Sequence, residues 1–224
     1  MTNTFERVRD SLGTAICDGS LAEGTLVTVE ELESTLGASR SIVREAARVL
    51  SSRGLLLARQ RVGLRVLGAR YWDAFDPLVL RWRLNSAARA AQLRDLADVR
   101  LAIEPEAARL AAVRRSAAEA AQLTTAAERL TASANGPSEQ FLASDTELHR
   151  LMLAASQNTL FIRFGTIIDE ALRDRALVER RLLPPDHTDV ELHRELARCI
   201  EAGDGTGAAH AMRSIVTRAH PLGQ

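Results

Sequence analysis

Apolar residues recur with a helical period through most of this 224-residue chain, and runs typical of strands occur only between residues 55 and 67. Within residues 5–17 the apolar positions lie three or four apart, which places them on one face of a helix. Gly19 follows this stretch, and glycine commonly ends a helix. The pattern predicts a mainly α protein that begins with an amphipathic helix.

Two short helices are expected next. Thr28 and Glu31 have the spacing of a capping box, in which each side chain bonds the backbone amide of the other residue, and Gly37 ends the helix that follows. A second helix with an apolar stripe covers residues 39–53 and stops at Gly54. Two short helices joined by a glycine-containing turn predict a helix-turn-helix.

A β-hairpin is expected directly after the second helix. Residues 55–58 and 64–67 are short apolar segments on either side of the polar stretch 59–63. Because two strands alone are not stable in water, the hairpin is expected to pack on the helices as a wing.

Helical periodicity returns at residue 69, in a composition rich in Ala, Leu and Arg. Helices are expected over residues 74–85, 90–115, 117–134, 137–156, 159–180, 188–202 and 205–220. Six or seven helices joined by short loops predict a bundle, in which ligand sites lie between facing helices. The expected organisation is a winged helix-turn-helix domain over residues 1–68 and an all-helical domain over residues 69–224.

The composition is that of a globular protein in a reducing compartment. Apolar residues make up 46% of the chain, and no apolar run approaches the ~20 residues that cross a membrane. Cys17 and Cys199 lie far apart in helical patterns and are expected to be buried thiols. A cytoplasmic protein without membrane contact is expected.

Charge is distributed unevenly, although the formal net charge is zero. Residues 1–36 contain two arginines and seven acids, whereas residues 37–67 contain seven arginines and one acid. A basic stretch on a neutral protein is typical of one face that meets phosphate. This stretch includes the predicted helix-turn-helix and wing, so DNA is the expected partner. For any single arginine, the alternative is a solvated charge or a surface ion pair.

Motifs in both halves resemble the GntR family of bacterial transcription regulators. Residues 39–46 match its DNA-binding pattern Ser-Arg-x-x-Val-Arg-Glu-Ala. The second half resembles its sensor domain of the FCD, or FadR, type through Arg100-x-x-x-Glu104-Pro105, Asp145-x-x-x-His149 and His193. Residues 72–82 are most similar to the branch of galactonate-operon repressors and other regulators that respond to sugar acids.

The resemblance implies that the helix over residues 39–53 enters the major groove, where an arginine can donate two hydrogen bonds to guanine. Arg40 and Arg44 lie one turn apart on that helix. The DNA-binding residues that the resemblance implies are Ser39, Arg40, Ser41, Arg44, Arg59, Arg61 and Gly63. Two positions depart from the family: Glu30 stands where a basic contact is expected, and Arg61 stands where a glycine is common.

A metal site is expected in the helical half. Asp145 and His149 are four residues apart and share one helix face. The resemblance adds His193 as a third ligand, and Zn, Mn or Ni suits this set. The family's fourth ligand is replaced by Ile215, so open positions would remain for water or an effector. The alternative is an Asp145–His149 ion pair on the surface and a hydrogen-bonded core histidine at 193.

The same resemblance casts Arg100 as a clamp for an anionic effector, because a guanidinium pairs well with a carboxylate. Glu104 lies one turn further along the same helix, so a surface Arg–Glu pair is the alternative. The residues expected to line the effector site are Arg100, Glu104, Asp145, His149, Arg175 and His193.

Three functions compete for these features. The first is a homodimeric DNA-binding repressor, which a small carboxylate such as a sugar acid releases from its operator. The second is a metal-dependent enzyme, since three ligands and an open position are also a catalytic arrangement. The third is a helical interaction module without DNA binding. The chain has no recognisable nucleophile motif or phosphate-binding loop, and only the first function explains the clustered arginines. A regulator without enzyme activity is therefore predicted.

Overall fold

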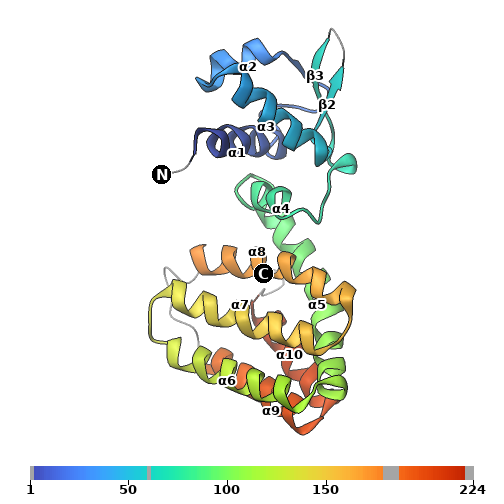
Figure 1. The fold of residues 1–224 in the computed structure, drawn as a ribbon, viewed down its shortest axis with the longest axis vertical. Helices are drawn as coiled ribbons and strands as arrows, with labels where there is room; N and C mark the ends of the chain where they lie inside the picture. Colours follow the sequence, from blue (N-terminus) through green and yellow to red (C-terminus); the bar gives the residue numbers. More distant parts are fainter. Residues whose placement is uncertain (1–2, 60–61, 179–186, 220–224) are drawn as a thin grey trace. The chain divides into compact units, whose positions relative to one another are not determined.

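The computed structural model describes residues 3–59, 62–178 and 187–219, with only the helical backbone for residues 175–178. The chain divides into two compact units, Met1–Gln92 and Leu93–Gln224, and the predicted mainly α fold is confirmed (Figure 1). None of the described helices is long and apolar enough to cross a membrane. Both cysteines are buried and free, as expected.

The first unit combines helices with a small sheet. Its elements are α1 (Thr4–Cys17), β1 (Leu26–Val27), α2 (Val29–Leu36), α3 (Arg40–Ser52), β2 (Leu56–Arg59), β3 (Gly63–Val66), a 3₁₀ turn (Ala69–Tyr71) and α4 (Pro77–Leu84). The antiparallel pair of β2 and β3 is the predicted wing, and β1 adds a third strand in the order β1-β3-β2. Strand β1 was not predicted, because a pair of residues shows no alternation.

Local caps fix the helix-turn-helix. The hydroxyl of Thr28 accepts from the amide of Glu31 at 3.2 Å, and the carboxylate of Glu31 accepts from the amide of Thr28 at 2.7 Å. Gly37 ends α2 with a φ of +58°, a left-handed conformation that favours glycine. Helix α3 packs on α1 and α2 and buries Val43 and Leu50, so its opposite face is left for other contacts.

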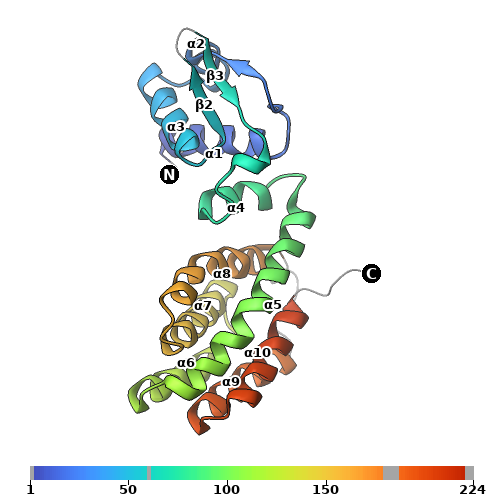
Figure 2. The same cartoon turned by 90° about the vertical axis from the view of Figure 1, so that its right-hand side faces the viewer.

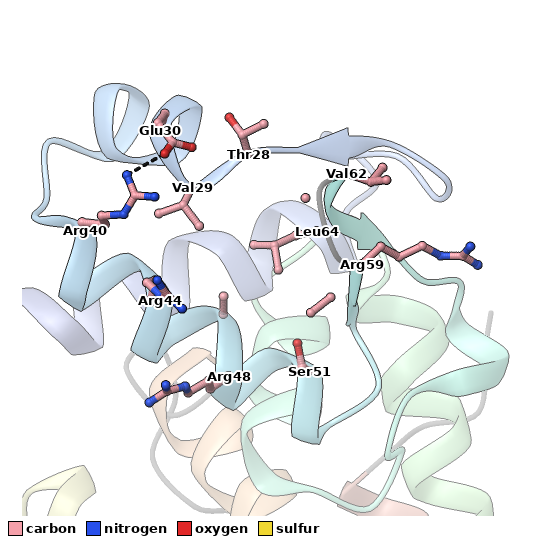
Figure 3. Close-up of a pocket in the computed structure, with 13 residues that line it drawn as sticks. Thr28, Val29, Glu30, Arg40, Arg44, Arg48, Ser51, Arg59, Val62 and Leu64 are labelled. Atoms are coloured by element: carbon pink, nitrogen blue, oxygen red, sulfur yellow. Dashed lines mark ion pairs between the residues drawn. The ribbon is translucent and has the colours of Figure 1, made fainter.

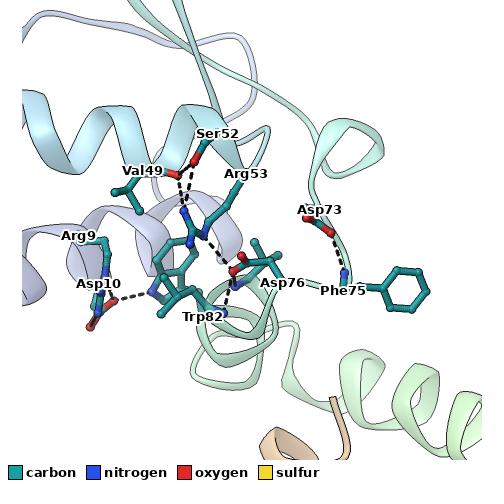
Figure 4. Close-up of polar contacts among 11 residues, drawn as sticks. Arg9, Asp10, Val49, Ser52, Arg53, Asp73, Phe75, Asp76 and Trp82 are labelled. Atoms are coloured by element: carbon teal, nitrogen blue, oxygen red, sulfur yellow. Dashed lines mark hydrogen bonds and ion pairs between the residues drawn. The ribbon is translucent and has the colours of Figure 1, made fainter. Parts of the chain in front are cut away.

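Helix α4 is part of the first unit, and polar contacts hold both of its ends (Figure 4). Asp76 caps its start and pairs with Arg53 at 3.0 Å. Near its end, the buried ring of Trp82 donates from Nε1 to Asp10 of α1 at 2.9 Å. A Cβ atom on Gly13 of α1 would lie 2.3 Å from the Trp82 ring. The glycine therefore makes room for α4.

The second unit is a bundle of helices (Figure 2). It contains most of α5 (Arg89–Arg114), then α6 (Ala117–Ser133), α7 (Ser138–Ala155), α8 (Thr159–Val178), α9 (His187–Ala202) and α10 (Gly205–Ala219). Helix α6 packs on α7 and α9, α7 packs on α8, and α9 packs on α10. Each corresponds to a helix that the sequence predicts.

Small side chains allow close packing of these helices. Ala107, Ala108, Ala111 and Ala112 of α5 are fully buried, in a core that includes Met152 and other large apolar residues. Several charged or polar side chains are buried in the same unit, namely Arg100, Glu104, Asp145, His149, Asp189 and His193. Because burying such groups is costly unless they are paired or hold a ligand, they mark the candidate site of this unit.

Candidate functional site

A groove of about 620 Å³ lies on the first unit between α2, α3 and the wing (Figure 3). Arg40, Arg44 and Arg48 of α3 line it, together with Arg59 of β2. Among the described residues that line the groove, Glu30 is the one acid. The surface is thus strongly basic, as expected from the charge of residues 37–67.

The three arginines of α3 share one side because they are four residues apart. Arg40 and Arg44 were predicted to do so, and Arg48 was not among the predicted DNA contacts. The signal was present in the sequence, since Arg48 continues the same spacing by one more turn. All three side chains are exposed, opposite the buried Val43 and Leu50.

The start of α3 is open to a partner. Ser39 is the N-cap residue, but its hydroxyl bonds none of the helix amides and instead lies 3.1 Å from the hydroxyl of Ser41. Both serines are exposed. The first amides of a helix are good donors to phosphate when no side chain caps them.

The wing supplies Arg59 and Gly63 to the same groove. Gly63 has a φ of +114°, and a Cβ atom there would lie 2.7 Å from the carbonyl oxygen of Val27. Only glycine fits this turn, which agrees with its predicted role at the wing tip. Arg61 lies outside the described residues.

A second constellation is buried inside the helical unit. Asp145 and His149 of α7 meet His193 of α9, and one ligand atom from each lies within 4.8 Å of the others. The Oδ1 atom of Asp145 is 3.2 Å from Nε2 of His193 and 3.5 Å from Nε2 of His149. The side chains are at most 5% exposed, so they are not the surface pair that the sequence left open.

Outer contacts orient both imidazole rings. Nδ1 of His193 donates to the backbone carbonyl of Asp189 at 2.6 Å, which leaves Nε2 facing the cluster. Nδ1 of His149 lies 2.7 Å from Oε2 of Glu104, so its Nε2 also faces the cluster. Such outer partners are typical of histidines that bind metal.

The donor set fits a divalent cation. Asp145 Oδ1, His149 Nε2 and His193 Nε2 face one another but form no hydrogen bond of good geometry with any described residue, and such poorly satisfied buried polar atoms are costly. Two imidazoles and a carboxylate suit Zn, Mn or Ni. Ile215 is 1% exposed within the apolar core and provides no donor. These three residues would hold the ion.

Mutual contacts outweigh burial in setting the charges here. Burial raises the pKa of Glu104, but Arg100 and His149 lower it to about 2. Burial lowers the pKa of His149, but the charge of Glu104 and the contact with Asp145 raise it to about 9. Burial likewise raises the pKa of Asp145, and the two histidines bring it well below its usual value. A divalent cation bound here would therefore meet ionised carboxylates and would have to displace a proton from His149.

Arg100 is held by Glu104 inside the unit. Nε of Arg100 lies 2.5 Å from Oε1 of Glu104, and the two side chains are 1% and 0% exposed. Nη1 of Arg100 is buried and has no hydrogen-bond partner among the residues that the structure describes. Glu104 thus contacts Arg100 through one carboxylate oxygen and His149 through the other. The link from Glu104 to His149 was not predicted, because no sequence spacing connects residues on different helices. The side chain of Arg175 lies outside the described part of α8.

The two halves of the chain match two protein families. The FCD domain family matches residues 95–218, and the bacterial regulatory proteins of the gntR family match residues 4–66. The chain belongs to the gntR family, in the branch with an FCD domain. It is therefore a transcription regulator and not a metal-dependent enzyme.

Curated relatives agree with this membership. The galactonate operon transcriptional repressor of Escherichia coli (strain K12) is 27% identical over 218 residues, which cover 96% of this chain and 94% of the relative. The probable D-xylose utilization operon transcriptional repressor of Paenarthrobacter nicotinovorans is 29% identical over 212 residues, with coverages of 94% and 84%. The resemblance to galactonate-type regulators is thus confirmed.

Solved structures share the fold. The Streptococcus agalactiae GntR structure has a TM-score of 0.53 at 23% identity and covers 95% of this chain and 97% of its own. Lar, which controls the expression of the Listeria monocytogenes agr system, has a TM-score of 0.59 at 14% identity, with coverages of 100% and 99%. At these identities the likeness concerns the fold alone.

Proposed function

We propose that the chain represses transcription as a homodimer on operator DNA, and that a small carboxylate such as a sugar acid releases it. The observation that carries this proposal is the groove of the first unit, which is lined by four arginines and includes the first residue of α3, a helix without a side-chain cap. The galactonate and D-xylose operon repressors among the relatives favour an effector derived from a sugar.

In the proposed complex α3 enters the major groove, as recognition helices of this class do. Arg40 and Arg44 contact base edges, with guanine as the expected base. Ser39, Ser41 and the free amides of α3 bind phosphate. Arg59, Arg61 and Gly63 bring the wing to the DNA backbone.

In the proposed sensor site Asp145, His149 and His193 hold a divalent metal ion, with Zn, Mn and Ni as the candidates. When bound, the ion supplies open coordination positions for oxygen ligands. Nη1 of Arg100 is a buried donor without a hydrogen-bond partner among the described residues, and Glu104 keeps the guanidinium in place. Arg175 is proposed as a further contact of the effector.

The functional division is proposed at residues 68 and 69, between a DNA-binding domain (1–68) and an effector-binding domain (69–224). The gntR match ends at residue 66, whereas α4 folds with the first unit. Dimerisation is proposed because two recognition helices would then reach half-sites one helical turn apart. Sedimentation of the protein at micromolar concentration tests the dimer, and a monomer with and without DNA would contradict it.

The repressor proposal is tested by fluorescence anisotropy with the DNA upstream of the chain's own gene. Binding should weaken steeply with salt, because arginine–phosphate contacts release counterions. Galactonate and other sugar acids are then added with and without Zn²⁺. An effector should release the DNA and raise the melting temperature of the free protein by mass action. Equal affinity for the upstream DNA and unrelated DNA would contradict the proposal.

A further inference from the structure

Glu30 places a negative charge on the surface that is proposed to meet DNA. It lines the groove beside Arg40, Arg44, Arg48 and Arg59, and no other described residue of the groove is acidic. A carboxylate at this position repels phosphate and lowers the affinity for DNA of any sequence. Whether Glu30 also affects the choice between DNA sequences depends on which groups its carboxylate contacts.

The carboxylate of Glu30 is bound to Arg40. Oε1 of Glu30 lies 2.5 Å from Nη1 of Arg40, and Figure 3 shows the two side chains facing each other from α2 and α3. The backbone amide of Glu30 and the guanidinium of Arg40 both lower the pKa of this carboxyl group, so it stays ionised at neutral pH. The two side chains are 61% and 57% exposed, so the pair is open to DNA.

The Glu30–Arg40 pair lies at the N-terminal ends of α2 and α3. Glu30 is one residue into α2, whose start is held by the Thr28–Glu31 capping box. Arg40 is the first residue of α3. In contrast, no acid pairs with Arg44 among the described residues of the groove. The two arginines predicted to reach bases thus differ: Arg40 is paired with an acid, and Arg44 has no acidic partner among the described residues.

We propose that Glu30 is a positioning residue for operator recognition, which acts by holding the guanidinium of Arg40. The proposal rests on the DNA-binding role of the groove. A guanidinium that is already held loses less rotamer freedom when it donates to guanine. The same ion pair restricts the Arg40 side chain from changing its conformation to bind the phosphates of an unrelated sequence. Glu30 therefore lowers non-specific affinity and raises selectivity.

The test compares Glu30→Gln with wild type on two duplexes of equal length. One carries the operator mapped by footprinting upstream of the chain's own gene, and the other carries the same bases in scrambled order. Binding to the scrambled duplex should tighten. The selectivity ratio, which is the Kd for the scrambled duplex divided by the Kd for the operator, should fall by ~3- to 10-fold, the range of an ion pair combined with one base contact. The variant should fold normally, since the side chain is exposed.

Glu45→Gln is the matched control. Glu45 pairs with Arg48 within α3 at 3.2 Å, and it does not line the groove. This variant removes the same charge from a neighbouring position, so it should strengthen binding to both duplexes equally and leave the ratio of the two Kd values unchanged. An equal fall of the ratio in Glu45→Gln would show a general charge effect and overturn the inference.

A double-mutant cycle tests whether Glu30 acts through Arg40. In the Arg40→Ala background, Glu30→Gln should leave the ratio unchanged. If the ratio still falls there, Glu30 reads a base directly, and the inference is wrong. An unchanged ratio in the single variant also overturns it. If wild type itself does not distinguish the duplexes, the proposed function of the groove fails, which is a separate outcome.

Discussion

Single residues of the same type have opposite environments in the two units. Arg44 is exposed in the groove of the first unit, with no acid paired to it among the described residues. Arg100 is 1% exposed and binds Glu104. The sequence placed Arg100 and Glu104 on one helix face, but an i,i+4 pair has the same spacing on a surface and in a core. Burial distinguishes them, and burial comes from the packing of other helices.

Base reading by Arg44 is tested by Arg44→Ala. Operator affinity should fall by ~1–3 kcal/mol if Arg44 donates to guanine, with the loss concentrated at one base position of each half-site. Arg59→Ala, in contrast, should weaken all sequences alike and flatten the salt dependence, because a wing arginine meets phosphate. Anisotropy with a set of single-base operator variants separates these patterns. If Arg44→Ala lowered the affinity for all operator variants equally, Arg44 would contact the DNA backbone and not a base.

Metal binding by the buried cluster is tested by Asp145→Asn. The change removes the anionic ligand at nearly constant size, so the affinity for Zn²⁺ should fall by at least the ~10- to 100-fold that loss of an outer partner costs. Isothermal titration with Zn²⁺ measures this directly. His187→Ala is the control, because His187 is an exposed residue of α9, the helix of His193. Equal Zn²⁺ affinity in wild type and Asp145→Asn would exclude the site.

Whole elements were more predictable than their contacts. The capping box of Thr28 and Glu31 defines the start of α2 in the sequence and in the structure, because all of its atoms belong to adjacent residues. The hairpin was readable from Gly63 and its flanking apolar runs. The docking of α4 on α1 could not be predicted from the sequence, since Trp82 and Asp10 are 72 residues apart. The cluster of Asp145 and His193 was likewise implied by the family resemblance and not by spacing.

The docking of α4 is tested by Gly13→Ala. Alanine favours a helix over glycine by ~1 kcal/mol, but its Cβ atom would lie 2.3 Å from the Trp82 ring. The rigid ring and the Asp10 hydrogen bond must then shift, so the variant should lose ~1–3 kcal/mol of stability. Gly165→Ala in α8 is the control, since its Cβ atom would lie 3.5 Å from Leu153, an ordinary contact. Thermal unfolding should show destabilisation in the first and stabilisation in the second.

At the scale of the whole molecule, α5 is the element that crosses the division of the chain. It begins at Arg89 in the first unit and continues to Arg114 in the second. It also carries Glu104, whose carboxylate lies 2.7 Å from His149 of the buried cluster of Asp145, His149 and His193. A rearrangement at the cluster would therefore act on a helix that is covalently continuous with the first unit, which contains the gntR match.

The resulting coupling is the last prediction. Effector binding should change operator affinity by ~1–3 kcal/mol, and operator DNA should weaken effector binding by the same factor, because linkage is reciprocal. His149→Ala should leave operator affinity nearly intact and abolish release, whereas His210→Ala, an exposed position of α10, should behave as wild type. Titrating effector into each operator complex measures release. Normal release from the His149→Ala complex would remove His149 from the sensor site. If this variant instead lost stability and operator binding together, its histidine would serve the fold and not the signal.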